Sequence, residues 1–499
     1  MNEKCFLGID LGAESGRVMA GLWDGRRMQL EEMHRFPNGG VPVGDSLRWD
    51  VVRLVGEIEK GLGMAARRYG NSIVSIGADT WAVDFVLLSK SGEMLGLPRH
   101  YREKRNRTAM ERMTEVVPRD EIFAASGIQF MPINTLCQMI AMKEENPELL
   151  EAADLFLMIP DFLHWSLCGA RVSEFTNATT TQFFHPKTKR WSTDLLGKFG
   201  IPTAMLPEVV QPGSELGILR ESVMQRTGLG KVRVVAPATH DTGSAVAAVP
   251  TAGTGTGNWA YISSGTWSLL GVELSAPNLS RRSVELNLTN EGGVDGTYRL
   301  LKNIMGLWLV QQCRRSFEQR GGVSDYTELV RLAEKAAPFR SLIDPDDLCF
   351  LNPPDMPDAI ANYCRATDQD IPRNEAEFVR CILESLALKY ATVLDWLKEM
   401  TGQWMEAIHI VGGGSRNGLL NQFTANACMR KVVAGPVEAT VLGNLLVQAR
   451  AAGELGSLDD MRRVTWTSAE VQEFQPEHAQ AWKEARQRFT GLLFRQRIA

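Results

Sequence analysis

One short pattern, a strand followed by a glycine-containing turn and a second strand, occurs once in each half of the chain. The first copy is IDLGAESGRVMAG (residues 9–21), and the second is ISSGTWSLLGVEL (residues 262–274). A duplicated α/β unit folds into two lobes, and the cleft between two lobes is a favoured place for a ligand. The repeat therefore predicts a two-domain α/β protein whose active site lies in an interdomain cleft.

The order of elements indicates which kind of α/β unit is duplicated. Three strand-like stretches occupy residues 5–36, a helical stretch occupies 49–68, and further strand-like stretches occupy 72–88. Three strands, a helix and then more strands is the order of a ribonuclease-H-like unit. In the second half, a helical stretch at 377–400 is followed by strand, helix, strand and helix between residues 407 and 452.

The length of the chain and one linker-like segment predict where the domains divide. A chain of 499 residues is long enough for two or three domains. The Gly/Thr-rich segment VPTAGTGTGNW, residues 249–259, is typical of a loop or hinge. We therefore expect an N-terminal domain over 1–248 and a C-terminal domain over 249–499, with the last helices as candidates to pack back on the N-terminal domain.

Composition and charge exclude several classes of protein. Lys plus Arg is 54 and Asp plus Glu is 59, a net charge of −5, so nucleic acid is not an expected partner. No apolar run approaches the roughly 18 residues of a membrane span, and MNEKCFLGID lacks the regions of a signal peptide. The eight cysteines form no C-x-x-C pair, which indicates a cytoplasmic protein with reduced thiols and no structural metal.

Both copies of the repeated pattern place a tight turn directly after a strand. In DLGAESGR, residues 10–17, the turn exposes backbone N–H groups that can hold phosphate oxygens, and Asp10 is placed to reach a magnesium ion directly or through water. In SSGTWS, residues 263–268, Gly265 and Thr266 offer an amide and a hydroxyl. Either stretch alone fits an ordinary β-hairpin, but two at equivalent points of duplicated lobes predict a clamp on a polyphosphate.

A third stretch, VGGGSRNGLLNQF (residues 411–423), is a glycine-rich junction between a strand and a helix. Such a junction lets a planar ligand or a phosphate lie against the backbone. It is not a Rossmann fingerprint, because the required third glycine is missing, and the chain contains no P-loop. A nucleotide would therefore be held by the two-lobed clamp.

The stretch VVAPATHDTGSAVAAVP, residues 234–250, leads from a strand into a helix of small residues. Asp at a helix start is most often an N-cap, and capping lowers the pKa of the carboxyl group. Phosphoryl transfer has a loose transition state, so a fixed, ionised Asp241 suffices to orient a hydroxyl and take its proton late. His240 and Thr242 are candidates to bond substrate hydroxyls, and the small residues would let the helix pack close to the other lobe. We do not expect a serine hydrolase, because the sequence contains no G-x-S-x-G elbow.

With these motifs in order, the chain resembles the FGGY carbohydrate kinases, two-lobed enzymes of the actin, Hsp70 and hexokinase superfamily. The matching stretches run over nearly the whole chain: DLGAESGR, DTWAVDFVLL, GIQFMPINTL, MIPDFLHW, TNATTTQ, THDTGSAVAAVP, YISSGTWSLLGVEL, TNEGGVDGTYRLLKNIMGLW and HIVGGGSRN. Within the family, TNEGG…LKNIMGLW resembles the branch that acts on L-rhamnulose. The resemblance implies two ribonuclease-H-like domains, the first on the sugar and phosphate side and the second on the nucleotide side.

The resemblance also implies a role for each residue that matches a family motif. Asp241 would accept the proton of the sugar 1-hydroxyl, and Asp10 would lie near Mg²⁺. The residues that would contact ATP are Ala13, Glu14, Ser15, Gly16, Arg17, Thr266, Gln311 and Gly413. The residues that would border the sugar are Ala82, His240, Asp241, Thr242 and Asn303.

The implied reaction is ATP-dependent phosphorylation of L-rhamnulose at its 1-hydroxyl, in L-rhamnose catabolism, by a monomer or homodimer. Ala82 stands where the family usually has glycine, and its methyl group would narrow the sugar pocket. A kinase for another ketose, such as L-fuculose or D-xylulose, is therefore an alternative. An ATP-switched binding protein is a second alternative, because actin and Hsp70 share the clamp.

Overall fold

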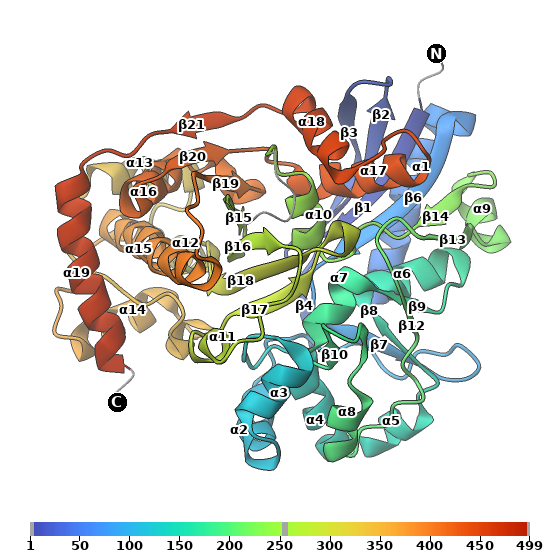
Figure 1. Cartoon of the computed structure of the whole chain (residues 1–499), viewed down its shortest axis with the longest axis horizontal. Coiled ribbons are helices and arrows are strands. Elements are labelled where there is room, and N and C mark those ends of the chain that lie inside the picture. The colour runs from blue at the N-terminus through green and yellow to red at the C-terminus, as the bar shows by residue number, and fades with distance from the viewer. Residues whose placement is uncertain (1–3, 252–257, 497–499) are drawn as a thin grey trace. The chain divides into compact units, whose positions relative to one another are not determined.

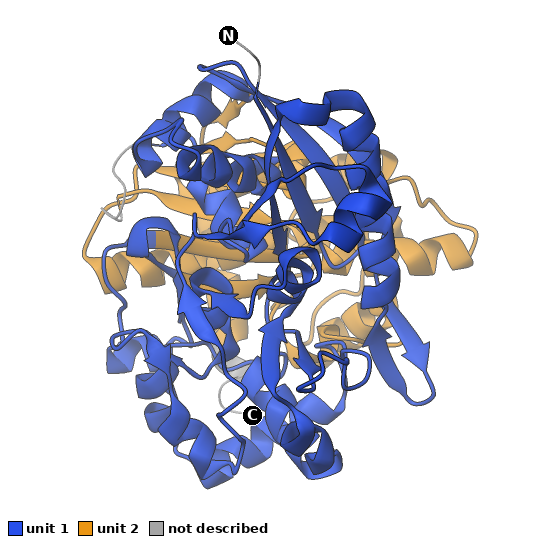
Figure 2. Cartoon of the chain, turned by 90° about the vertical axis from the view of Figure 1, so that its right-hand side faces the viewer, with its two compact units in different colours: residues 1–256, 273–300, 438–469 blue, residues 257–272, 301–437, 470–499 orange. Residues whose placement is uncertain are grey.

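The computed structural model describes residues 4–251 and 258–496, and its contacts divide the chain into two compact units (Figure 2). Unit 1 consists of Met1–Thr256, Glu273–Leu300 and Glu438–Ala469, and unit 2 consists of Gly257–Val272, Leu301–Val437 and Glu470–Ala499. Each unit thus draws on segments far apart in sequence. The single domain boundary expected at 248/249 stays a prediction, and much of the hinge expected at 249–259 lies outside the described residues.

Unit 1 contains a six-stranded sheet in the order β13-β14-β6-β1-β2-β3 (Figure 1). β1 pairs antiparallel with β2 and parallel with β6, and the helix α1 (Val51–Tyr69) connects the first three strands to β6. This is the predicted ribonuclease-H-like order. The strands of the sheet are β1 (Lys4–Leu11), β2 (Ser15–Trp23), β3 (Met28–Pro37), β6 (Ile73–Thr80), β13 (Glu215–Ile218) and β14 (Arg233–Val235).

A seven-stranded sheet follows the order β17-β18-β16-β15-β19-β20-β21. β15 pairs antiparallel with β16 and parallel with β19, as β1 does with its own two neighbours, so the predicted duplication of an α/β unit is confirmed. The strands of this sheet are β15 (Ala260–Ser264), β16 (Trp267–Leu274), β17 (Thr289–Gly292), β18 (Tyr298–Met305), β19 (Ala407–Val411), β20 (Lys431–Ala434) and β21 (Gln472–Phe474).

Helices complete both units. The helical stretch predicted at 377–400 is α15 (Glu375–Thr401), which ends at Gly402 in the left-handed conformation. Unit 2 also contains α12 (Trp308–Gln319), α13 (Tyr326–Lys335), α14 (Met356–Ala366), α16 (Gly418–Cys428) and α19 (Ala479–Gln496). Unit 1 also contains α2 (Arg105–Val116), α3 (Arg119–Ser126), α4 (Thr135–Glu145), α5 (Pro147–Ala152), α6 (Ile159–Cys168), α7 (Phe175–Ala178), α8 (Thr193–Lys198), α9 (Glu221–Thr227), α10 (Asp241–Ala247), α11 (Arg281–Glu285), α17 (Ala439–Ala451) and α18 (Leu458–Ser468).

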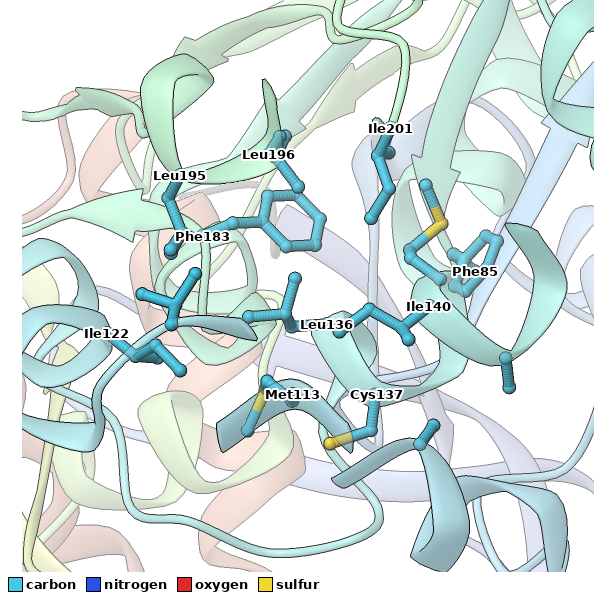
Figure 3. Close-up of a cluster of buried hydrophobic side chains, with 14 of the residues drawn as sticks. Phe85, Met113, Ile122, Leu136, Cys137, Ile140, Phe183, Leu195, Leu196 and Ile201 are labelled. Atoms are coloured by element: carbon cyan, nitrogen blue, oxygen red, sulfur yellow. The ribbon is translucent and has the colours of Figure 1, made fainter. Parts of the chain in front are cut away.

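A cluster of buried side chains in unit 1 supports the strand that follows Ala82 (Figure 3). That strand, β7 (Phe85–Leu88), pairs antiparallel with β8 (Leu155–Met158). The rings of Phe85 and Phe156, one from each strand, lie 5.1 Å apart inside the cluster. Helices α2, α3, α4 and α8 add apolar residues to it, among them Met113, Ile122, Leu136, Ile140 and Leu195. The turn that carries Ala82 is therefore attached to a packed core.

Further short strands in unit 1 form pairs outside the main sheet. These are β4 (Gly40–Val43) with β5 (Ser46–Trp49), β9 (Val172–Glu174) with β12 (Glu208–Val210), and β10 (Phe184–His185) with β11 (Arg190–Trp191). No helix among residues 4–251 and 258–496 is both long and apolar enough to cross a membrane.

Helix α17, from the last fifth of the chain, packs on the sheet of unit 1 beside β1 and β6 (Figure 1). Gln448 donates to the Leu7 carbonyl at 3.0 Å, and Asn444 donates to the Asp79 carboxylate at 2.6 Å. The same helix lies directly against α10, because a Cβ added at Gly443 would stand 1.9 Å from the Ser244 carbonyl oxygen. The small residues of α10 thus do allow a close helix contact, and the partner helix belongs to the same compact unit.

Candidate active site

Asp241 is the first residue of α10, and His240 precedes it in extended conformation. The Asp241 carboxylate accepts from the Thr242 amide at 2.5 Å and from the Thr242 hydroxyl at 3.2 Å. His240 occupies the N-cap position, so Asp241 is not the ordinary cap that its place in the sequence suggests. The Asp241 side chain is 32% exposed, whereas the rest of the helix is buried. The carboxylate is thus the accessible group of α10.

The pKa of Asp241 is raised above the usual value of an aspartate. Burial among protein atoms is the main cause, and the nearby Asp10 carboxylate adds to the rise. The lowered pKa expected from capping is therefore wrong, because desolvation outweighs the bonds from Thr242. A raised pKa makes Asp241 a stronger proton acceptor, which suits a general base.

The turn after β1 is held closed by backbone bonds. The Gly12 amide donates to the Ser15 carbonyl at 2.9 Å, and the Asn38 amide donates to the Glu14 carbonyl at 3.0 Å. Ala13, Glu14, Ser15 and Gly16 therefore stay together in one short loop and strand start. Backbone N–H groups in a tight turn of this kind can bind an anion such as a phosphate.

Arg17 lies at the end of this turn and pairs with two carboxylates. It donates to Asp10 Oδ2 at 2.9 and 2.7 Å, and it also pairs with Glu438. Although burial alone would lower its pKa, the two carboxylates raise the pKa of Arg17 above its ordinary value. Arg17 thus orients Asp10, which sequence reasoning did not anticipate.

A second carboxylate, Asp79, lies beside Asp10. The two residues are register partners on the parallel strands β1 and β6. Asp79 is fully buried, and burial together with the Asp10 charge raises its pKa well above the usual value. No described residue bonds its Oδ1 atom. Asp79 was not among the residues predicted from the sequence, although SIGAD ends in a carboxylate at a strand end, as CFLGID does with Asp10.

Ala82 lies in a strained turn between β6 and β7. The next residue, Val83, has φ +68°, a left-handed conformation that costs a β-branched residue roughly 1–2 kcal/mol. Thr135 donates to the Val83 carbonyl at 2.7 Å and helps to hold this conformation. Asp84 accepts from Trp49 at 2.5 Å, and it also accepts from Trp81 and Gln138. Burial raises the pKa of Asp84 to about 7. This fixed turn determines where the Ala82 methyl group lies.

A buried pair of opposite charges lies beside the Nδ1 atom of His240. Arg299 and Glu291 both come from the TNEGGVDGTYRLL stretch. Arg299 Nη2 lies 3.1 Å from His240 Nδ1, and Glu291 Oε2 lies 3.3 Å from both of these nitrogens. His240 Nε2 lies 3.4 Å from Asp241 Oδ1. Both residues lie in the stretch that resembles the L-rhamnulose branch, but no role was predicted for either of them from the sequence.

The segment before His240 is held by Glu174, which sequence reasoning also missed. This buried carboxylate accepts from the amide and hydroxyl of Thr239 at 2.9 and 2.7 Å. It also accepts from the amide and hydroxyl of Thr176 at 2.9 and 2.5 Å, and the Thr176 hydroxyl accepts from the His240 amide at 3.2 Å. Four bonds to one buried carboxylate fix the start of α10.

Three of the residues predicted to contact ATP, namely Thr266, Gln311 and Gly413, lie in unit 2. Thr266 lies in the turn between β15 and β16, and its carbonyl accepts from the amides of Gly306 and Trp308, both at 3.2 Å. Trp308 begins α12, which carries Gln311, a residue whose buried Oε1 atom no described residue bonds. Gly413 begins a short 3₁₀ helix after β19. Asn303, predicted to border the sugar, lies on β18.

The turn after β19 lies directly against the end of β15. A Cβ added at Gly414 would stand 2.1 Å from the Ser264 hydroxyl oxygen. Gly412 has φ +84°, and its Cβ would stand 3.1 Å from the Ser264 carbonyl. Glycine is therefore required at both positions, whereas a Cβ at Gly413 would meet no atom within 4 Å. The open side at Gly413 suits a ligand that approaches the backbone.

The donor set fits a magnesium ion that enters with phosphates. Within the described part of the chain, no group of three or more His, Cys, Asp or Glu side chains could hold a metal ion. Mg²⁺ usually takes one or two carboxylates and completes its shell with water and substrate phosphates. Both bonds from Arg17 converge on Asp10 Oδ2, which leaves Oδ1 for a cation or its water.

Comparisons with known proteins agree over nearly the whole chain. The models of the N-terminal and C-terminal domains of the FGGY family of carbohydrate kinases match residues 5–248 and 260–452. The rhamnulokinase of Bacteroides thetaiotaomicron is 46% identical over 97% of this chain and 98% of its own length. The rhamnulokinase of Klebsiella pneumoniae is 43% identical over 95% of each chain.

Solved structures show the same fold at much lower sequence identity. A gluconate kinase from Lactobacillus acidophilus superposes with a TM-score of 0.79 at 15% identity, covering 98% of both chains. A xylulose kinase from the same organism gives a TM-score of 0.78 at 15% identity over 98% of this chain and 97% of its own. The two-domain sugar-kinase fold predicted from the sequence is therefore confirmed.

Proposed function

Since this chain belongs to the FGGY family of carbohydrate kinases, we propose that it transfers the γ-phosphoryl group of ATP to the 1-hydroxyl of L-rhamnulose. The products are L-rhamnulose 1-phosphate and ADP. The observation that carries the substrate is the identity of 46% over 97% of the chain with a protein named rhamnulokinase. Related proteins of that name from other bacteria are 40–43% identical over at least 93% of this chain.

Asp241 acts as the base in the proposed reaction. Its carboxylate is the accessible group at the start of α10, and burial raises its pKa toward that of a useful proton acceptor. It orients the 1-hydroxyl and accepts its proton as the hydroxyl oxygen bonds the γ-phosphorus and the bond to the β-phosphate oxygen breaks. Ala82, His240, Thr242 and Asn303 border the sugar in this proposal.

The nucleotide is held by the two duplicated turns in this proposal. Ala13, Glu14, Ser15, Gly16 and Arg17 contact the phosphates from the turn after β1, and Thr266, Gln311 and Gly413 contact ATP from unit 2. Asp10 would hold Mg²⁺ directly or through water, and the ion would offset the charge of the phosphates. Exclusion of water from the site during the transfer would prevent water from competing as the acceptor.

The cellular setting is also proposed. The reaction serves L-rhamnose catabolism in the cytoplasm, the sugar and ATP are the small-molecule partners, and the enzyme is a monomer or a homodimer. All eight cysteines are free thiols, which supports a reducing compartment.

A coupled ADP-release assay tests the proposed function. L-Rhamnulose, L-fuculose, D-xylulose, L-ribulose and glycerol are each offered with Mg·ATP. We expect the highest kcat/KM with L-rhamnulose, which would also show that Ala82 is tolerated. A different preferred ketose would support the kinase activity and show that the proposed sugar specificity is wrong. ATP binding without stimulation by any sugar would instead favour an ATP-switched binding protein.

A further inference from the structure

We infer that Arg299 and Glu291 hold His240 in one tautomer, whose Nε2–H donates to the ketose oxygen next to the reacting hydroxyl. Arg299 and Glu291 are positioning residues, and His240 is the group that touches the substrate. The inference rests on the proposed function for the identity of the sugar. The tautomer itself rests on the geometry behind His240 alone.

The side chains around the Nδ1 atom of His240 are buried. Arg299 has no exposed side-chain surface, and the side chains of His240 and Glu291 are about equally hidden, at 6% and 5% exposure. Arg299 Nε donates to the Gly292 carbonyl at 2.9 Å, which fixes the guanidinium. Its Nη2 atom then lies 3.1 Å from His240 Nδ1 and 3.3 Å from Glu291 Oε2. Solvent therefore does not compete for the Nδ1 side of the ring.

The donor inventory decides which ring nitrogen carries the proton. His240 Nδ1 has the Arg299 guanidinium at 3.1 Å and the Glu291 carboxylate at 3.3 Å, and we assign the hydrogen bond to the shorter contact. Because a guanidinium has only donors, Nδ1 then accepts this bond and carries no proton. In a neutral imidazole the other nitrogen, Nε2, then carries the hydrogen. Glu291 cannot bond an unprotonated Nδ1, because a carboxylate only accepts. Its role is to balance the buried charge of Arg299, which would otherwise be costly.

The protonated nitrogen of His240, Nε2, lies next to the Asp241 carboxylate. His240 Nε2 is 3.4 Å from Asp241 Oδ1, so one donor and one acceptor lie next to each other. Two oxygens on neighbouring carbons of a sugar lie at a comparable separation. When Asp241 accepts the proton of the 1-hydroxyl, the His240 Nε2–H is placed to donate to the oxygen on carbon 2. In the opposite tautomer, with the hydrogen on Nδ1, the lone pair of Nε2 would face that oxygen and repel it.

The tautomer is measured directly on the full chain, without any activity. The protein is labelled with ¹⁵N-histidine, and long-range ¹H–¹⁵N correlations are recorded near neutral pH. The His240 signals are identified by their loss in both His240→Gln and His240→Asn, so that one misfolded variant does not prevent assignment. We expect the pattern of an Nε2–H imidazole with an unprotonated Nδ1. An Nδ1–H or a doubly protonated ring would overturn the inference.

Arg299→Gln then tests the positioning role. We expect a mixture of His240 tautomers and an increase of about tenfold in KM for the ketose, as for one lost hydrogen bond, with KM for ATP unchanged. An unmixed Nε2–H tautomer in this variant, or an unchanged KM for the ketose, would overturn the role of Arg299. If the variant does not fold, Glu291→Gln combined with Arg299→Gln removes the unpaired charge and is expected to give the same two results.

A matched control separates this effect from lost stability. Arg462 and Glu273 form another buried arginine–glutamate pair in unit 1, with an N–O distance of 2.7 Å and 0% and 2% exposure. Arg462→Gln should lower stability to a similar degree but leave the His240 tautomer unchanged. If L-rhamnulose is not phosphorylated while the Nε2–H tautomer is found, the proposed function fails and the tautomer stands. If it is phosphorylated and the tautomer differs, only this inference fails.

Discussion

The turn after β1 in unit 1 and the turn after β15 in unit 2 occupy the same place in two sheets of the same pattern, but only the first is charged. Asp10 and Ser263 are equivalent in the repeat. The parallel neighbour of Asp10 is Asp79, whereas the parallel neighbour of Ser263 is Val411. One turn is thus surrounded by carboxylates, and the other by hydroxyls and glycines.

This difference shows how a duplicated fold divides its chemistry. The backbone pairing is the same in both copies, so the scaffold does not decide what each turn does. In unit 1, burial raises the pKa of both Asp79 and Asp241, and the charge of Asp10 adds to each rise. In unit 2, Gly412 and Gly414 bring backbone against Ser264. The turn of unit 1 thus offers carboxylates to a ligand, whereas the turn of unit 2 offers hydroxyl groups and backbone.

Asp241→Asn should produce the largest effect, because it removes the proton acceptor and changes only one atom. We expect kcat to fall roughly 10²–10⁴-fold, the usual contribution of general base catalysis, while ATP still binds. Steady-state kinetics and calorimetric titration with ATP check both parts. Near-normal turnover would show that Asp241 of unit 1 does not supply the base.

Asp10→Asn should produce the next largest effect. The loss of a carboxylate near Mg²⁺ should weaken the apparent affinity for the metal by about 10–100-fold. Turnover measured against Mg²⁺ concentration at fixed ATP gives this value. Ser263→Ala, at the equivalent position of unit 2, is the matched control and should change the Mg²⁺ dependence little. Equal effects at the two positions would contradict the assignment of the cation to unit 1.

The pH dependence of kcat/KM tests whether Asp241 is the base. Because the pKa of Asp241 is raised, the carboxylate gains a proton at a higher pH than an ordinary aspartate and then cannot act as a base. We expect kcat/KM for the ketose to fall about tenfold per pH unit once the pH is below this raised pKa. For stability the sign is opposite: the raised pKa favours the fold at low pH, and this contribution is lost as pH rises through that pKa. A profile that falls only near the usual aspartate value would count against Asp241 as the base.

Substitution of glycines tests the backbone packing of unit 2, and the expected effect is a modest loss of stability. Gly414→Ala places a Cβ 2.1 Å from the Ser264 hydroxyl and should lower the free energy of unfolding of unit 2 by about 1–3 kcal/mol. Gly413→Ala, where a Cβ meets no atom within 4 Å, is the control for stability. Gly12→Ala in unit 1, with its nearest atom at 3.5 Å, should also be nearly neutral. Denaturant unfolding of the three variants checks the order; equal losses would show that close backbone packing does not distinguish the two turns.

Much of the fold could be predicted from the sequence, because strands, turns and helices depend on residues close together in the chain. Apolar spacing gave the long helix α15 within two residues at its start and one at its end. The glycine turns identified both hairpins of the duplication, and the carboxylate at a strand-to-helix junction singled out Asp241. The roles carried by resemblance, from Ala13 to Gly413, remain predictions that the experiments above test.

Only the tertiary structure decided which distant residues share a site. It placed Glu438 beside Arg17, Asn444 on Asp79, and the Glu291–Arg299 pair behind His240. It also reversed the expected direction of the Asp241 pKa, since desolvation depends on every atom packed around the carboxylate and not on its neighbours in sequence. Local sequence thus determined the repeated strand, turn and helix pattern, whereas long-range packing determined the partners of Arg17, Asp79 and His240 and the direction of the Asp241 pKa shift.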